Sequence, residues 1–406
     1  MVARNKVWTR RSLLGATATL AAWAHVPRYA HAAQGRDPRF VTLILRGALD
    51  GLSTVAPIGD PNYAGLRKDL ALTRDGNTPA LMLDSFFGLH PAMPHMARLY
   101  QKGEALVLHA IATSYRERSH FDGQDMLESG MPKPGFVDSG WMNRALQALP
   151  MGERIAAQNG LGIGAITPLI MRGKAPVLGW SPPALQHADD QLTARLLALY
   201  HERDPQLASA LESGLTADRI AGRAGVQPQR SGGLKELMKI TAQGAARLMA
   251  EPDGPRLAAL AFDGWDTHSN EGGAIGQLAN MLSGLDEAIA AFETQLGPVW
   301  KETVLMIVTE FGRTAAINGT IGTDHGTGTI AFLVGGAISG GRVITDWPGL
   351  KPQQLHDGRD LAPTTDLRAA MKGVLYDHLG LSPEILRNRI FPNSNAVAPM
   401  RGLISV

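Results

Sequence analysis

The chain of 406 residues exceeds the usual size of one hydrophobic core, so one large elaborated domain and two domains are both open. Apolar residues make up 44% of the chain and charged residues 19%, which excludes a long disordered or coiled-coil architecture. A formal net charge of +2 without a dense Lys/Arg stripe gives no reason to expect nucleic acid, and the lack of cysteine excludes disulfides, thiolate metal sites and cysteine nucleophiles.

The N-terminus has the pattern of an export signal. The paired arginines of "TRRSLL" precede an Ala-rich run that closes on "AHA". This pattern predicts a twin-arginine signal peptide over residues 1–32, with cleavage after Ala32 or Ala33. The apolar run from Leu13 to Val26 is too short and too weakly hydrophobic to span about 30 Å of hydrocarbon. We therefore expect a periplasmic or secreted protein with no stable membrane anchor after cleavage.

The chain that follows alternates short β-rich runs with helical ones. Continuous apolar runs predict strands, and apolar residues at helical spacing predict helices. Strands are expected within 40–51, 105–112, 176–180, 256–263, 303–312 and 329–336, and helices at 90–104 and 275–300. Because the strands are continuously hydrophobic, we predict an α/β fold with a mostly parallel central sheet and helices on both faces.

The pattern changes between Gly152 and Gly254. Polar, helix-forming segments lie there beside the Gly-rich "AGRAGVQPQRSGGL". We interpret residues 152–254 as a helical insertion or cap on a single domain that spans residues 33–406.

Polar residues collect where the predicted strands end. Ligands of open parallel sheets bind beyond the carboxyl ends of the strands, so these residues are expected to converge. They are Asp50, Ser119, His120, Asp122, Asp125, Asp263, Asp266, His268, Glu310, Arg313, Asp324 and His325. Each also has a structural explanation, as a helix cap, a strand-end charge or a satisfied polar group. Carboxylates and imidazoles without cysteine suit one or two divalent ions, with Zn, Mn, Mg, Ca and Fe all open.

Two of these polar residues, and Arg46 in the first predicted strand, have candidate roles other than metal binding. Ser119 begins a predicted helix, where a nearby metal and the helix dipole favour a nucleophilic hydroxyl; alternatively it caps the helix in a capping box with Asp122. Arg46 and Arg313 are candidate guanidinium donors to a tetrahedral anion, or members of structural salt bridges.

Several ordered motifs resemble a known family. The segments "RGALDGL", "SHFDGQDMLESG", "GWDTHSNEGG", "TEFGRTAAINGTIGTDHG" and "GGAISGGRV" resemble the bacterial exported family called domain of unknown function 1501, over nearly the whole mature chain. That family is similar to the alkaline phosphatase and sulfatase superfamily, which implies an alkaline phosphatase-like domain. The resemblance implies that Asp50, Asp266, His268 and His325 bind metal and that Ser119 stands at the nucleophile position.

The sequence departs from the superfamily pattern at two places. Glu310 stands where the superfamily carries Asp, and Phe311 replaces the histidine that follows it. The spacing from Asp266 to His268 is also short, so Asp263 is a candidate substitute or additional ligand, and Asp324 is a candidate to compensate for the missing histidine.

The sequence is consistent with two functions. The first is an exported metal-dependent hydrolase of a phosphate or sulfate ester, acting on a small-molecule or polymer substrate. The alternative is a catalytically degenerate binding or assembly protein on the same scaffold. An exported oxidoreductase ranks below both, because the sequence has no cysteine pattern for haem or iron-sulfur clusters and no G-x-G-x-x-G after the first strand.

Overall fold

The computed structural model describes residues 36–405 apart from 136, 150–159, 165, 182–195, 216–232 and scattered positions between 198 and 213. The predicted signal peptide and its cleavage site lie outside the described residues. The chain from Pro38 onward forms one compact unit.

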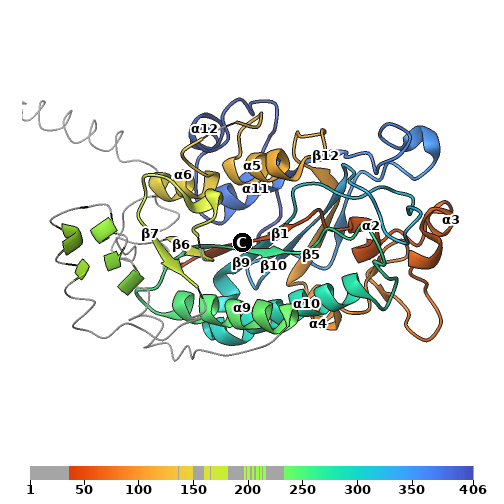
Figure 1. The fold of residues 1–406 in the computed structure, drawn as a ribbon, viewed down its shortest axis with the longest axis horizontal. Coiled ribbons are helices and arrows are strands. Elements are labelled where there is room, and N and C mark those ends of the chain that lie inside the picture. Colours follow the sequence, from red (N-terminus) through yellow and green to blue (C-terminus); the bar gives the residue numbers. More distant parts are fainter. Residues whose placement is uncertain are drawn as a thin grey trace, which may run out of the picture. The chain divides into compact units, whose positions relative to one another are not determined.

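A nine-stranded sheet forms the centre of this unit (Figure 1). Its order is β11-β5-β10-β9-β1-β8-β6-β7, and β12 also pairs with β5. Strand β10 runs antiparallel to both of its neighbours, whereas the other pairings are parallel. The strands are β1 (Arg39–Arg46), β5 (Ala105–Ala112), β6 (Gly160–Ile163), β7 (Val177–Trp180), β8 (Leu257–Asp263), β9 (Thr303–Val308), β10 (Thr329–Val334), β11 (Val343–Ile344) and β12 (Thr365–Asp366). The predicted α/β fold with a mostly parallel sheet is confirmed.

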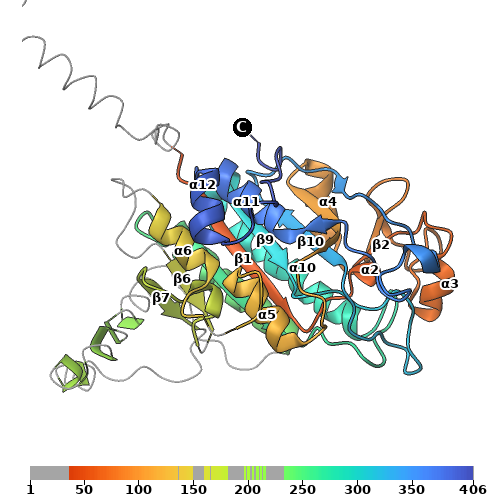
Figure 2. The same ribbon diagram turned by 90° about the horizontal axis from the view of Figure 1, so that it is seen from above.

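Helices cover both faces of the sheet (Figures 1 and 2). One face carries α4 (Pro94–Lys102), α9 (Leu234–Ala250) and α10 (Gln277–Leu296). The other carries α5 (His120–Ser129), α6 (Trp141–Ala148), α11 (Leu367–Asp377) and α12 (Pro383–Ile385). The shorter elements are α2 (Gly51–Thr54), α3 (Tyr63–Arg67), η2 (Lys68–Leu70), η3 (Leu169–Met171), η4 (Gly297–Glu302), η5 (Pro352–Gln354), η6 (Leu386–Ile390) and a small sheet of β2 (Val55–Ala56), β4 (Gly88–Leu89) and β3 (Leu81–Met82).

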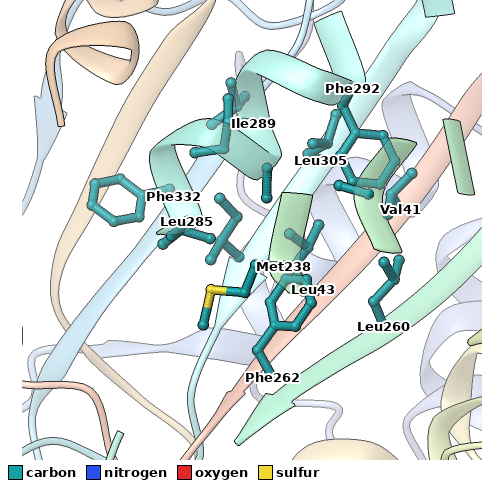
Figure 3. Packing of buried hydrophobic residues seen from close by; sticks show 14 of the residues in the cluster. Val41, Leu43, Met238, Leu260, Phe262, Leu285, Ile289, Phe292, Leu305 and Phe332 are labelled. Carbon is teal, nitrogen blue, oxygen red and sulfur yellow. The ribbon is translucent and has the colours of Figure 1, made fainter. Parts of the chain in front are cut away.

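The alternation of side chains along β1 explains why both faces are covered. Val41 and Leu43 belong to the core under α4, α9 and α10, whereas Phe40 and Ile44 belong to the core under α5, α6 and α11. Figure 3 shows the first core, where Val41 and Leu43 lie with Phe292 of α10. Successive strand residues point to opposite faces, so an unbroken apolar strand requires a helical layer on each side. Each buried large aliphatic or aromatic side chain contributes about 1.5–3 kcal/mol.

The predicted elements agree with the structure in most places. The helix predicted at 90–104 begins at Pro94, where proline fits the first turn. The helix predicted at 275–300 is α10 followed by η4. Within residues 152–254 the structure describes the edge strands β6 and β7 and the helix α9, of which β6 was not predicted. Most of residues 182–232 lie outside the described residues, so the cap stays a prediction.

No helix in the described part of the chain is long and apolar enough to cross a membrane.

Candidate metal centre

Three histidines from three separate segments meet at the carboxyl edge of the sheet. His120 is the first residue of α5, which follows β5, and His268 lies in the turn after β8. His325 precedes β10 and forms an isolated bridge with Arg313, in the segment after β9. Parallel strands end at the same edge, and an antiparallel strand begins there, which brings these segments together.

The Nε2 atoms of the three rings converge beside Asp266. His325 Nε2 lies 2.9 Å from His120 Nε2 and 3.0 Å from His268 Nε2. The Asp266 carboxylate lies 3.0 Å from His268 Nε2, 3.3 Å from His325 Nε2 and 3.5 Å from His120 Nε2. Ligand atoms of His120, Asp266 and His325 all lie within 4.8 Å of one another. Adjacent donors around a tetrahedral zinc ion are about 3.3–3.5 Å apart, so the group of His120, Asp266 and His325 fits one ion, with His268 beside it.

The opposite nitrogen of each ring faces an oxygen. His325 Nδ1 donates to the carbonyl oxygen of Arg118 at 3.0 Å, and His120 Nδ1 donates to Glu310 Oε1 at 2.8 Å. His268 Nδ1 lies 3.3 Å from Asp324 Oδ1. A neutral imidazole that donates from Nδ1 presents a lone pair at Nε2. Three lone pairs this close repel one another unless a positive charge, a proton or a metal ion, lies between them, and outer hydrogen bonds of this kind are typical of metal-binding histidines.

Asp266 is held from two sides. Arg313, whose side chain is fully buried, donates from Nη1 to Asp266 Oδ1 at 2.5 Å, and its other nitrogens donate to the carbonyl and hydroxyl oxygens of Thr323. Gly47, with φ +119°, packs under the turn: a Cβ there would lie 2.6 Å from the Asp266 backbone nitrogen. The Gly47 amide also donates to Glu310 Oε1 at 2.8 Å. The turn after β1 therefore fixes both the aspartate and the carboxylate that orients His120.

These contacts set the charge of the groups. The pKa of His120 is raised, chiefly by its bond to Glu310, although partial burial opposes this. Burial, followed by the neighbouring His120, lowers the pKa of His325. Burial alone would raise the pKa of Asp266, but Arg313 outweighs it and the pKa is lowered. Burial likewise opposes ionisation of Glu310, yet its bond to His120 and the other hydrogen bonds lower its pKa. The site therefore combines ionised carboxylates with imidazoles.

Phe311 takes the place where the resemblance implies a further histidine. Its ring stacks on His120, with centroids 5.0 Å apart and planes 29° apart, and lies 5.4 Å from the ring of His325. An aromatic ring cannot bind a metal ion there, but it holds the two imidazoles in place by packing.

Ser119 is the N-cap residue of α5, next to His120 in the chain. Its side chain makes no capping hydrogen bond, so the capping box with Asp122 does not form. Instead, Asp122 accepts from the hydroxyl of Tyr115, which itself accepts from the Ser119 amide. The hydroxyl of Ser119 is thus not committed to the helix.

Asp50 does not reach the histidines. It caps α2, with Oδ1 accepting from the Ser53 amide, and its Oδ2 pairs with Arg67 of α3. Glu271 lies beside them, and the side chains of Asp50, Arg67 and Glu271 are all buried. Burial and the nearby Asp50 raise the pKa of Glu271 to about 7.

The other predicted residues lie around the centre. Asp324 contacts His268 from the solvent side. Asp263, the last residue of β8, is exposed and outside the ligand group. Arg46 forms a 2.5 Å salt bridge with Glu128 of α5. In all, the structure brings together Asp266, His268, Glu310, His325, Asp324 and Arg313, and it holds Asp50, Asp263 and Arg46 apart.

Sequence reasoning assigned no role to three residues that shape this region. His120 is among the strand-end polar residues predicted to converge, but it was not predicted as a metal ligand. Glu271 lies in "GWDTHSNEGG", next to predicted ligands. Arg67 belongs to no motif, and no signal in the sequence pointed to it.

The fold and these contacts define an α/β protein with a three-histidine, one-aspartate cluster at the carboxyl edge of its sheet. The chain belongs to the family described as "Protein of unknown function (DUF1501)", whose profile matches residues 37–388. The recognition of this family from its motifs is thereby confirmed. No curated protein matches the chain.

Several solved structures are similar at low identity. Ps i-CgsB in complex with k-i-k-neocarrahexaose is 10% identical with a TM-score of 0.46, covering 89% of this chain and 76% of that one. A protein in the alkaline phosphatase superfamily from Vibrio parahaemolyticus is 13% identical with a TM-score of 0.37, covering 74% of this chain and 61% of that one. The phosphonate monoester hydrolase of Agrobacterium radiobacter is 13% identical with a TM-score of 0.33, covering 85% and 74%.

Proposed function

We propose that this protein is an exported metal-dependent hydrolase of phosphate or sulfate esters, with one divalent ion held by His120, Asp266, His268 and His325. The observation that carries the proposal is the convergence of three Nε2 atoms on one carboxylate, with an oxygen behind each ring. Three imidazoles and a carboxylate are donors that suit Zn²⁺. When bound, such an ion supplies a Lewis acid that stabilises negative charge on a transferred phosphoryl or sulfuryl group.

The chain itself supplies the remaining groups. Ser119, at the start of α5 and free of a capping bond, would provide the attacking oxygen, which the positive end of the helix dipole favours as an alkoxide. All three side-chain nitrogens of Arg313 are already used, so we assign it to holding Asp266 rather than to binding the substrate. Arg359, which is partly exposed and donates to the carbonyl oxygen of His325, is the better candidate to meet an anionic substrate.

Export through the twin-arginine route, to the periplasm or outside the cell, is part of the proposal. It is supported by the paired arginines and the Ala-rich run of the N-terminal segment. That pathway carries folded proteins, which suits a metal bound before export.

The test combines elemental analysis with hydrolysis of p-nitrophenyl phosphate and p-nitrophenyl sulfate. We expect the wild type to hold metal and to hydrolyse one of the two esters, Ser119→Ala to keep the metal but lose turnover, and His325→Ala to lose both. His95→Ala is the matched control, because His95 also pairs with a glutamate, Glu293, but on α4. Full hydrolysis by Ser119→Ala, or a wild type that binds no divalent ion, would refute the mechanism.

Two observations favour the binding or assembly protein. Asp50, expected as a ligand, is tied to Arg67, and Phe311 stands where a ligand is expected. Loss of ligands on an enzyme scaffold is how catalytic sites decay. A wild type that binds metal but hydrolyses neither these esters nor a wider ester panel would support this second function.

A further inference from the structure

Asp50 lies in a closed polar cluster next to the histidines. We define the Asp50 cluster as Asp50, Ser53, Arg67, Thr267, Glu271 and Thr323. The guanidinium of Arg67 contacts Asp50 Oδ2 and the Ser53 hydroxyl, and lies 3.7 Å from Glu271 Oε1. Hydroxyls complete the set: Ser53 donates to Glu271 Oε1, and Thr267 and Thr323 lie 2.9 Å from Glu271 Oε2.

Charge explains why Arg67 is there. The side chains of Asp50, Arg67 and Glu271 are each at most 1% exposed, so water cannot neutralise them. Buried carboxylates need a positive partner. Two carboxylates and three hydroxyls are otherwise the all-oxygen surroundings that a hard divalent ion prefers. Here a guanidinium, attached to the chain through α3, occupies that place.

We infer that Arg67 supplies, as a built-in cation, the positive charge that a second metal ion would supply at Asp50, so the centre binds a single ion at the three histidines. This inference rests on the proposed function, because it takes the histidine cluster to bind metal. It departs from the expectation that Asp50 is itself a metal ligand, since both of its carboxylate oxygens are used within the protein.

The cluster also reaches the metal centre through one residue. Thr323 contacts Asp50 and Glu271 through its hydroxyl, and its hydroxyl and carbonyl oxygens accept from Arg313. Arg313 in turn holds Asp266. Asp50 and Arg67 are therefore positioning residues: they fix Thr323, which fixes the arginine that aims the Asp266 carboxylate at the histidines.

The first experiment counts metal ions. Full-length protein is saturated with Zn²⁺ or Mn²⁺ in separate preparations, freed of excess ion and examined by elemental analysis. We expect one ion per chain in the wild type, one in Asp50→Asn, bound more weakly because Thr323 and Arg313 are less well fixed, and none in His325→Ala. Two ions in the wild type, falling to one in Asp50→Asn, would overturn the inference, because Asp50 would then be a ligand of a second ion. No ion in the wild type would refute the proposed function instead, and the second experiment alone would then decide the role of Arg67.

The second experiment removes the built-in cation. Arg67→Ala leaves two buried carboxylates facing an empty space, so we expect its melting temperature to fall and to be raised by low millimolar guanidinium, Mn²⁺ or Ca²⁺ to a greater extent than in the wild type. Arg98→Ala, which removes an exposed arginine paired with Glu293, is the control that should respond as the wild type does. A variant Arg67→Ala that melts like the wild type without added cation would contradict the inference. If Arg67→Ala does not fold, the ion count in the wild type and in Asp50→Asn still decides whether a second ion binds at Asp50.

Discussion

Glu310→Gln tests whether the carboxylate behind His120 tunes the metal centre. Glu310 is 1% exposed, and its Oε1 accepts from His120 Nδ1 and from the Gly47 amide, both at 2.8 Å. Its Oε2 lies 3.0 Å from the Thr309 hydroxyl. Glutamine has the same shape and keeps an oxygen for His120 and Gly47, and its amide group can donate to Thr309. The substitution therefore removes the negative charge and leaves the packing unchanged.

The magnitude follows from the strength of that one bond. A hydrogen bond to a charged group contributes about 1.5–3 kcal/mol, against about 0.5–1.5 kcal/mol for a neutral one. The difference of about 1–1.5 kcal/mol corresponds to roughly tenfold in an equilibrium constant. Loss of an outer hydrogen-bond partner of a metal-binding histidine typically weakens metal binding about 10–100-fold. We therefore expect Glu310→Gln to weaken Zn²⁺ binding about 10–100-fold without unfolding the protein.

The assay is competition for Zn²⁺ against a chromophoric chelator, alongside urea unfolding of the metal-free protein. Glu293→Gln serves as the control, because it neutralises a glutamate that also contacts a histidine, His95, at 3.0 Å but on the surface. Glu293→Gln should bind Zn²⁺ as the wild type does. A folded Glu310→Gln protein with wild-type Zn²⁺ affinity would refute the idea that Glu310 acts on the metal through His120.

Two further predictions concern the surroundings of the centre. Because the pKa of Glu271 is raised to about 7 from 4.5, its contribution to stability is greatest at low pH and is lost as the pH rises through about 7. As the pH rises from 5 to 8, the wild type should therefore lose stability relative to Glu271→Gln, by at most about 3 kcal/mol in urea unfolding. A difference in the free energy of unfolding that stays constant over this range would contradict the shifted pKa. Gly47→Ala should lower the free energy of unfolding by about 1–3 kcal/mol and weaken metal binding, because its Cβ would strike the Asp266 backbone. Gly65 lies in α3 with no atom near an added Cβ, so Gly65→Ala should lower neither the free energy of unfolding nor the metal affinity. If both variants kept the wild-type values, the contact at Gly47 would be unimportant.

The periodicity of the sequence predicted the sheet and the edge at which polar residues meet. Runs such as "FVTLILR" are apolar on both faces of a strand, which is typical of a mostly parallel sheet covered by helices on both sides. The turns after β8 and β9 follow from where those runs end, and so does the meeting of His268, Glu310 and His325. The short strand β6 was not predicted, because "GLGI" has two glycines and no apolar periodicity.

The sequence could not predict which polar residues touch each other. Ser119 and His120 are neighbours at a helix start, and only the rotation of α5 decides that the imidazole faces Glu310. Asp50 follows a strand in the expected way, but its partner Arg67 comes from a separate short helix. Pairing of this kind depends on loop conformation, which leaves no periodic pattern in the sequence.

Phe311 and Arg67 both act against the binding of a second metal ion. The resemblance implies metal ligands both at position 311 and at Asp50. Phe311 removes the first and contributes packing against His120 instead, with ring centroids 5.0 Å apart. Arg67 removes the second by neutralising Asp50 from within the chain. Without Arg67 the buried carboxylates would have no positive partner, whereas with both residues in place Asp50 is paired and the histidine cluster is intact. We therefore expect that restoring one feature alone, as in Phe311→His, adds no second ion to the elemental count while Arg67 is present, and a count of two ions in that variant would contradict this reasoning.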